Sequence, residues 1–345
     1  MLKVSYQIVR GEVYKDLNQK VEAYFNDKKL VKEGNRPLHI LALILFLSFI
    51  GVYFGWILVT QSAWLSILFG VVLGILAGIL GAFGHEATHR AFAKEKWVNN
   101  LMLYFSDFVG RSSYKYGQVH AMHHTYTNVD EQDPDIQLQP ILRVHPHQKQ
   151  YFYHKFQHIY AVFVYGLAAF HTVYNFGSYF NFFKNKKWRL KSVFWISKIW
   201  HILFFLVVPI WLLGWQNGIA GYLSFMVSAG LYFSAIIQPS HLFSESEFTQ
   251  PNPETNKLEE EWTVRMIAAT SNYSNGNKRL SIFYAGMDYH IIHQIFPQIS
   301  MVHYPELNKI IREYCHQKGL NYVEHKNLPQ ALVNHFKFLH KMGQS

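Results

Sequence analysis

The sequence has little charge and almost no cysteine. Of its 345 residues, 16% are Asp, Glu, Lys or Arg, whereas 50% are hydrophobic and 17% are aromatic. Such a low charge content is unusual for a soluble protein of this size, and it favours a protein that lies in a membrane. The single cysteine, Cys315, excludes an internal disulfide and any metal site built from several thiolates. A metal would have to be held by histidine, carboxylate or amide side chains.

The positive charge of the chain points to lipid rather than to nucleic acid. Lys and Arg outnumber Asp and Glu by 32 to 22, which gives a net charge of +10. The basic residues lie beside apolar segments and no nucleic-acid-binding motif accompanies them. We therefore expect anionic lipid head groups, and no nucleic acid, as their partners. Residues 1–38 are basic and contain no long apolar run, which predicts a cytosolic N-terminal leader rather than a signal peptide.

Four long apolar segments predict an all-α integral membrane protein with four transmembrane helices. Each has about the 20 residues that a helix needs to cross the hydrocarbon core. The first two are joined by the uncharged dipeptide Gln61-Ser62, and the last two by the uncharged residues 214–218, so we expect two hairpins. The predicted spans cover about residues 39–60, 63–84, 193–215 and 217–239.

Basic residues set the expected orientation of these spans. The segment "KNKKWRLK" precedes the third span, and the leader is basic, whereas neither hairpin tip carries a charge. By the positive-inside rule, both termini lie in the cytosol, and residues 85–192 and 240–345 form one helical cytosolic cap. The apolar stretch 158–183 is not predicted to be a fifth span, because it would place His171 and Asn175 in the middle of the membrane. An interfacial or partly embedded helix is the preferred interpretation.

Two further helices are predicted in the C-terminal part of the chain. Residues 305–317 and 329–342 alternate apolar and polar side chains with the period of an amphipathic helix. The segment "TQPNPETNK" before them is rich in turn-forming residues and predicts a loop.

Twenty histidines are present, and three groups of them share one spacing. Side chains three and four residues apart project from the same face of a helix, so each group can present its imidazoles to one point. A separate histidine, His241, lies just after the end of the fourth predicted span. The grouped residues are His85 and His89, then His120, His123 and His124, then His290 and His293 followed by Gln294.

These histidines supply more donors than one zinc ion needs, because zinc takes three or four ligands. Eight imidazoles suit two metal ions, each with a position left open for oxygen or a bridging ligand, and imidazole binds iron as well as zinc. The sequence His85-Glu86-Ala87-Thr88-His89 also matches the motif of zinc proteases, in which Glu86 would act as the general base. That alternative leaves the other histidine groups unexplained.

The combination resembles the membrane fatty acid desaturase family, whose three histidine boxes bind two irons at the cytosolic face of four spans. The segments that carry the resemblance are "GHEATHRAF", "HAMHHTYTNVDEQDPDI" and "DYHIIHQIFPQISMVHYPEL", and "QPSHLF" is similar to the stretch that supplies a further histidine. The resemblance implies one desaturase domain over residues 39–345, a di-iron cofactor with O₂ as co-substrate, and His85, His89, His120, His123, His124, His241, His290 and His293 as ligands. It also implies that Asp133 and Asp135 orient ligand imidazoles.

The third box departs from the family pattern at Gln294, where relatives have a second adjacent histidine. An amide oxygen is a weaker ligand than imidazole, so Gln294 is a doubtful ligand. The simplest interpretation is an active enzyme with a modified site, while altered chemistry and an inactive lipid-binding relative remain alternatives. Met301 stands where relatives often have histidine, and His303 is the best candidate among the ungrouped histidines.

The resemblance further implies an O₂-dependent fatty acyl desaturase. An unactivated C–H bond has no acidic proton and no leaving group, so a radical-type oxidant is required, and irons that reduce O₂ supply it. The substrate would be an acyl chain on CoA, an acyl carrier or a lipid. No cytochrome b5 signature is present, so an external electron donor such as cytochrome b5 or ferredoxin is expected. A related hydroxylase or acetylenase is the alternative within this class.

Overall fold

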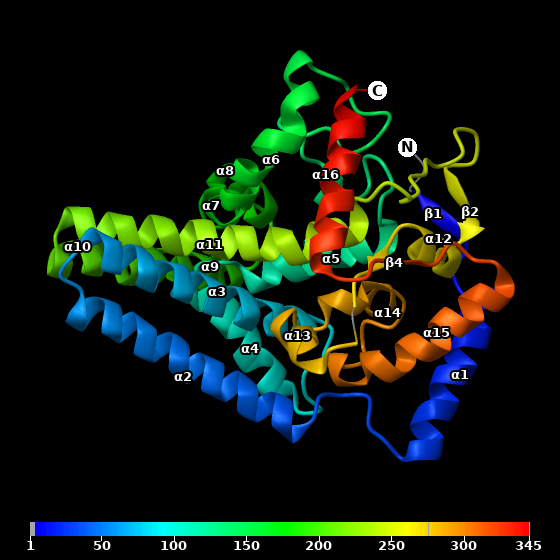
Figure 1. Ribbon diagram of the computed structural model, residues 1–345, viewed down its shortest axis with the longest axis horizontal. Helices are drawn as coiled ribbons and strands as arrows, with labels where there is room; N and C mark the ends of the chain where they lie inside the picture. The colour runs from blue at the N-terminus through cyan, green and yellow to red at the C-terminus, as the bar shows by residue number, and fades with distance from the viewer. Residues whose placement is uncertain (1–3, 275, 345) are drawn as a thin grey trace. The chain divides into compact units, whose positions relative to one another are not determined.

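The computed structural model describes residues 4–274 and 276–344, and over these ranges the chain is mostly helical (Figure 1). The first three residues of the expected leader and the last residue of the chain lie outside the described residues. The chain divides into two compact units. Unit 1 contains the residues up to Glu33, Val119–Ala161 and the residues from Ile236 on; unit 2 contains Gly34–Gln118 and Val162–Ala235.

Within the described residues, four helical segments are long and apolar enough to cross a membrane, as the sequence predicts. Each begins or ends within a few residues of the predicted bounds. The third is not a regular helix, because a π-helical turn interrupts it between two α-helices. The segments are α2 (Arg36–Val59), α3 (Ala63–Thr88), the succession of α9 (Trp188–Ile202), η3 (Leu203–Val207) and α10 (Val208–Leu213), and α11 (Trp215–His241).

Polar residues fix where the first two of these helices begin. The side-chain oxygen of Asn35 accepts a hydrogen bond from the backbone N–H of Leu38 (3.1 Å), and Ser62 does the same for Leu65 (3.3 Å). Each bond satisfies one of the backbone donors that the first turn of a helix leaves without a partner. The three residues 60–62 are all that separates α2 from α3, and the two helices pack against each other.

Aromatic side chains and glycines pack the apolar helices of unit 2. Trp56, which is fully buried, donates from its indole nitrogen to the hydroxyl of Ser66 (3.1 Å), so its polar atom is satisfied inside the apolar core. Gly74 lets α3 approach α11 closely: a Cβ atom at this position would lie 2.5 Å from the carbonyl oxygen of Phe225. Small residues at helix crossings are the usual means of close packing in lipid.

The stretch 158–183 does not form a continuous span. It is divided among three short helices, none of which is long enough to cross a membrane. This agrees with the prediction that no fifth span forms there. The three helices are α6 (Gln157–Gly166), α7 (Ala168–Tyr174) and α8 (Phe176–Phe183); the preceding segment contains α4 (Lys96–Phe108) and α5 (Ser113–Tyr126), η1 (Pro134–Ile136) and η2 (Phe152–Phe156).

Unit 1 joins the beginning of the chain to its later part. The strand β1 (Ser5–Ile8) pairs in parallel with β2 (Lys257–Glu261), and α1 (Glu12–Lys28) lies beside α15 (Tyr304–Lys318) (Figure 1). The carboxylate of Glu261 accepts hydrogen bonds from the backbone N–H groups of Val13 (3.2 Å) and Tyr14 (2.8 Å). A carboxylate at this end of α1 also favours the helix dipole.

The remaining elements of unit 1 are short, apart from the last helix. Both amphipathic helices that the sequence predicts are present, as α15 and α16. The elements are α12 (Trp262–Ala268), α13 (Lys278–Phe283), η4 (Met287–Tyr289), α14 (His290–Ile295), η5 (Met301–His303) and α16 (Leu328–Gln344), with β3 (Ser271–Asn272) paired in parallel with β4 (Val323–Glu324).

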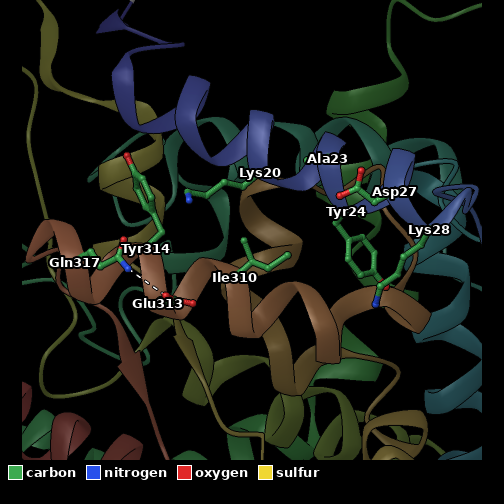
Figure 2. Close-up of a pocket in the computed structure, with 9 residues that line it drawn as sticks. All are labelled: Lys20, Ala23, Tyr24, Asp27, Lys28, Ile310, Glu313, Tyr314 and Gln317. Carbon is green, nitrogen blue, oxygen red and sulfur yellow. Dashed lines mark hydrogen bonds between the residues drawn. The ribbon is translucent and has the colours of Figure 1, made fainter.

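A pocket of about 400 Å³ lies between α1 and α15, and Figure 2 shows the side chains around it. Acidic and basic side chains line it together, and none of the residues that line it is a candidate metal ligand. They are Lys20, Ala23, Tyr24, Asp27, Lys28, Ile310, Glu313, Tyr314 and Gln317.

Candidate metal centre

The second histidine group lies on the last two turns of α5. His120, His123 and His124 are all buried, and the Nε2 atoms of His120 and His124 are 2.9 Å apart. The spacing of four residues places these two side chains on one face of the helix. His123 points to a different set of neighbours, so α5 supplies ligands in two directions.

The third group lies on α14 and meets the second. His293 Nε2 lies 3.1 Å from His124 Nε2, and the ligand nitrogens of His120, His124 and His293 all lie within 4.8 Å of one another. We call these three residues the first ligand group. Its members come from segments about 170 residues apart in the sequence, as the separation of 169 between His124 and His293 shows.

The lone histidine at the end of α11 belongs to a second set. His241 Nε2 lies 2.8 Å from His290 Nε2, and the Gln294 side-chain nitrogen lies 3.0 Å from His123 Nε2 and 3.4 Å from His241 Nε2. All four side chains are buried. We call His123, His241, His290 and Gln294 the second ligand group.

These separations fit the coordination sphere of a metal ion. A metal–nitrogen bond of about 2.0–2.1 Å places neighbouring ligand nitrogens about 2.9 Å apart at right angles and about 3.4 Å apart in a tetrahedron. Five neighbouring nitrogen pairs within the two groups are 2.8–3.4 Å apart. Neutral imidazoles in this arrangement are suitable donors for zinc or iron. The histidine-rich cluster is therefore compatible with metal binding.

A buried carboxylate orients His123. The Nδ1 atom of His123 lies 3.0 and 3.1 Å from the two carboxylate oxygens of Asp133, which is fully buried. Nδ1 therefore donates to Asp133, which leaves Nε2 facing the ligand group. Burial alone lowers the pKa of His123, but Asp133, Asp135 and this hydrogen bond together raise it to about 9, so a metal ion that binds His123 would displace a proton from Nε2. Asp135 is farther from the ring, at 3.6 Å, and its side chain is 46% exposed.

The first histidine group lies at the end of α3, in unit 2. His85 is buried in the last turn of the helix and His89 is the residue that ends it. Their rings are perpendicular, with centroids 5.3 Å apart, and the ring of Tyr116 lies 6.2 Å from that of His85. Glu86, between them, is buried as well. The helix continues to Thr88, beyond the expected end of the second span at about residue 84, and His85 lies in its last turn.

The resemblance to the family also singles out His303 and Met301, which pack against other residues of unit 1. His303 packs edge-on against Phe25 of α1, with ring centroids 4.9 Å apart. Met301 is buried against Gly286, where a Cβ atom would lie 2.5 Å from that of Met301.

Sequence reasoning missed the residues that hold the ligand-bearing segments together. Asn128 is fully buried, and its amide nitrogen lies 3.0 Å from the carbonyl oxygen of His241. The Trp262 indole donates to the carbonyl oxygen of His124 (3.2 Å). The only sequence signal for Asn128 is its place directly after a helix, where asparagine tolerates a left-handed backbone. Nothing in the sequence links Trp262 to α5.

Comparisons with known proteins show the family to which this chain is similar. Residues 62–326 match the family model described as fatty acid desaturase. An sn-1 linoleoyl-lipid 6-desaturase of Arthrospira platensis is 25% identical, with 95% of this chain and 92% of that protein covered. A protein of the same name from a Synechocystis species is 28% identical, with 95% of each chain covered. An acyl-lipid (8-3)-desaturase of Physcomitrium patens is 26% identical over 96% of this chain and 72% of that protein.

Proposed function

This chain belongs to the fatty acid desaturase family, and from that premise we propose that it inserts a double bond into lipid-bound acyl chains with two iron ions. Its family and its relatives make it an oxidoreductase that acts on fatty acids, namely a fatty acyl desaturase. The iron, the carrier of the acyl chain, the electron donor and the orientation in the membrane are the parts that we propose. The two buried ligand groups, with nitrogens at the spacing of neighbouring ligands, are the observation that carries the proposal.

We assign one iron to each ligand group. The first group contains only imidazoles, and His85 and His89 complete it in this proposal, because three nitrogens alone leave an iron short of ligands. The second group contains three imidazoles and Gln294. Rotation of the Gln294 amide by 180° exchanges its nitrogen and its oxygen, so the oxygen can take the position that now faces His123.

The residues of the chain prepare and hold the site rather than break the C–H bond themselves. When bound, the two irons supply the O₂ chemistry that an unactivated C–H bond requires. The imidazoles hold them in place, and Asp133 keeps His123 in the tautomer whose Nε2 is free to ligate. Burial of the ligand groups excludes water from the place where a reactive oxidant is needed.

The substrate is proposed to be an acyl chain esterified to a membrane lipid. Two relatives are named as desaturases of linoleoyl-lipid and others as acyl-lipid desaturases. These names support a lipid-bound acyl chain as the substrate. The four apolar helices are consistent with access from the bilayer. Product analysis by mass spectrometry determines the chain length and the position of the bond.

Electrons are proposed to come from a separate carrier such as cytochrome b5 or ferredoxin. The net charge of +10 supports an acidic carrier, since opposite charges steer two proteins toward each other. We also propose that both termini and the ligand groups face the cytosol. Reporter fusions at residues 61 and 214 and at both termini test this orientation, and a cytosolic signal at either inter-helix junction contradicts it.

Expression in a host without desaturases tests the function directly. We expect about two irons per chain and a new O₂-dependent double bond in a lipid fraction, measured by elemental analysis and mass spectrometry. His290→Ala and His293→Ala should each abolish the product and lower the iron content of the chain. His316→Ala is the matched control, because His316 is exposed on α15 and should leave both unchanged.

Other outcomes of the same experiment assign other functions. About one zinc and no iron contradicts the di-iron proposal and favours the protease. A hydroxylated or triple-bonded product with two irons assigns the related hydroxylase or acetylenase. Gln294→His and Gln294→Ala then test the second group: we expect the histidine variant to retain or increase iron content, and the alanine variant to lose iron.

A further inference from the structure

We infer that Asn128 is a positioning residue that sets the second ligand group by holding the backbone of His241. The inference rests on the proposed di-iron function, and it concerns a residue outside the histidine boxes. It comes from the hydrogen bonds of one buried side chain, which connects the end of α5 to the end of α11 within unit 1.

The side chain of Asn128 closes the end of α11. Its amide nitrogen lies 3.0 Å from the carbonyl oxygen of His241, 2.8 Å from the hydroxyl of Ser246 and 3.3 Å from the carbonyl oxygen of Ala269. The Ser246 hydroxyl donates to the same His241 carbonyl (2.9 Å). A helix leaves its last carbonyl groups without partners, and these two donors satisfy the one that belongs to the ligand. The bonds fix the backbone of His241 and therefore the place from which its ring projects.

The backbone of Asn128 is tied to the other side of the same group. Its N–H donates to Asp133 (2.9 Å), and the same carboxylate accepts from Nδ1 of His123. One residue thus contacts both the carboxylate that orients His123 and the carbonyl of His241. The rings of these two histidines are perpendicular, with centroids 4.6 Å apart. Among the described residues, the hydrogen-bond partners of the Asn128 side chain and N–H are Asp133, His241, Ser246 and Ala269, and none of these belongs to the first ligand group.

The residue type fits this role for two reasons. Asn128 has φ of 57°, in the left-handed region that asparagine, aspartate and glycine tolerate best. An amide also offers two N–H donors to oxygen acceptors, whereas the isosteric carboxylate of aspartate offers none. Glycine keeps the backbone conformation and removes the side chain. The two substitutions therefore separate the backbone requirement from the hydrogen bonds to His241.

The test compares Asn128→Asp and Asn128→Gly with the wild-type chain by iron content, Mössbauer spectra and cobalt(II) titration of the metal-free protein. We expect about two irons in the wild type and about one in both variants, with one quadrupole doublet lost. Cobalt(II) should show one site unchanged and the other about 10- to 100-fold weaker, the effect of altering the surroundings of a ligand. Adding His293→Ala to Asn128→Asp should then remove the remaining site.

Asn334→Asp serves as the matched control. Asn334 is half-buried, and its oxygen accepts from the backbone N–H of Ser244 (2.9 Å), which aspartate preserves. Its amide donates to the exposed carboxylate of Glu245 (2.9 Å), so the control also loses an amide donor, but one that does not hold a ligand histidine. It should bind two metal ions with the affinities of the wild type. The inference is overturned if both Asn128 variants bind two cobalt ions as the wild type does, or if both sites weaken equally together with the melting temperature. A wild-type chain without iron would refute the proposed function instead, and the cobalt titration would still decide the role of Asn128.

Discussion

Replacement of Asp133 by Asn should weaken both the fold around α5 and the second ligand group. One Asp133 oxygen accepts from His123 Nδ1 (3.0 Å) and the backbone N–H of Asp135 (2.9 Å), and the other lies 3.1 Å from the same Nδ1 and accepts from the N–H of Asn128 (2.9 Å). Asparagine has the same shape, but one of its two terminal atoms is a donor. In either orientation of the amide, its NH₂ group faces a backbone N–H, and a buried donor is left without an acceptor.

The expected magnitude follows from this arrangement. A buried donor without an acceptor costs about 1–3 kcal/mol, and loss of the negative charge weakens the remaining bonds further. We expect the metal-free Asp133→Asn variant to lose about 2–4 kcal/mol of unfolding free energy. Loss of the carboxylate behind a ligand histidine should reduce metal affinity about 10- to 100-fold, or about 1.4–2.7 kcal/mol.

Denaturation of the metal-free protein and competition with a chelator measure the two effects separately. Asp130→Asn is the control on the same loop, since Asp130 is not fully buried and lies 3.6 Å from His145 rather than beside a ligand. An Asp133→Asn variant that is as stable as the control and binds metal equally well would refute the reasoning.

Three further predictions test the packing and the buried groups. Gly74→Ala should destabilise the chain by about 1–3 kcal/mol, because no room exists for a Cβ atom at this position. Gly51→Ala should be neutral, because nothing lies within 4 Å of its Cβ position. A Gly51→Ala variant that is less stable than Gly74→Ala in thermal denaturation would contradict this. Burial lowers the pKa of His335 to about 4, below its usual 6.5, so the unfolded chain binds the proton first as the pH falls from 6.5 to 4. The free energy of unfolding should therefore fall by up to about 1.4 kcal/mol per pH unit over this range, and it should fall less in His335→Gln. Melting temperatures of the two proteins that fall equally between pH 7 and pH 5 would contradict this. Burial raises the pKa of Cys315 to about 12, so iodoacetamide at pH 8 should label it only after denaturation, as mass spectrometry can show.

The apolar helices were predictable because composition alone decides them. About 20 uncharged residues have few alternatives to a spanning helix, and the four predicted segments coincide with α2, α3, α9–α10 and α11 to within a few residues. Hydrophobicity does not mark where a helix ends, however. The second span was predicted to end at about residue 84, and the helix that contains it continues to Thr88. The π-helical turn at 203–207 has no compositional signal either.

The histidine groups were predictable in part, from spacing along a helix. The four-residue separation of His120 and His124 places both on one face, and the structure has their Nε2 atoms 2.9 Å apart. The division of the ligands into two groups was not predictable, because His241 and His290 meet only through the packing of segments 49 residues apart. The contacts of Asn128 and Asp133 have the same origin. Such contacts depend on which loops come together, and no local period encodes that.

The bonds between Glu261 and the start of α1 have a consequence for the order of events during synthesis. Residues 13 and 261 are separated by 248 positions, and the strand that pairs with β1 is made equally late. At a translation rate of about 5–20 residues per second, the first helix leaves the ribosome about 10–50 s before its partner carboxylate exists. For that time the N-terminal segment must stay soluble without its final contacts. Its many charged side chains, from Glu12 to Lys28, provide that solubility.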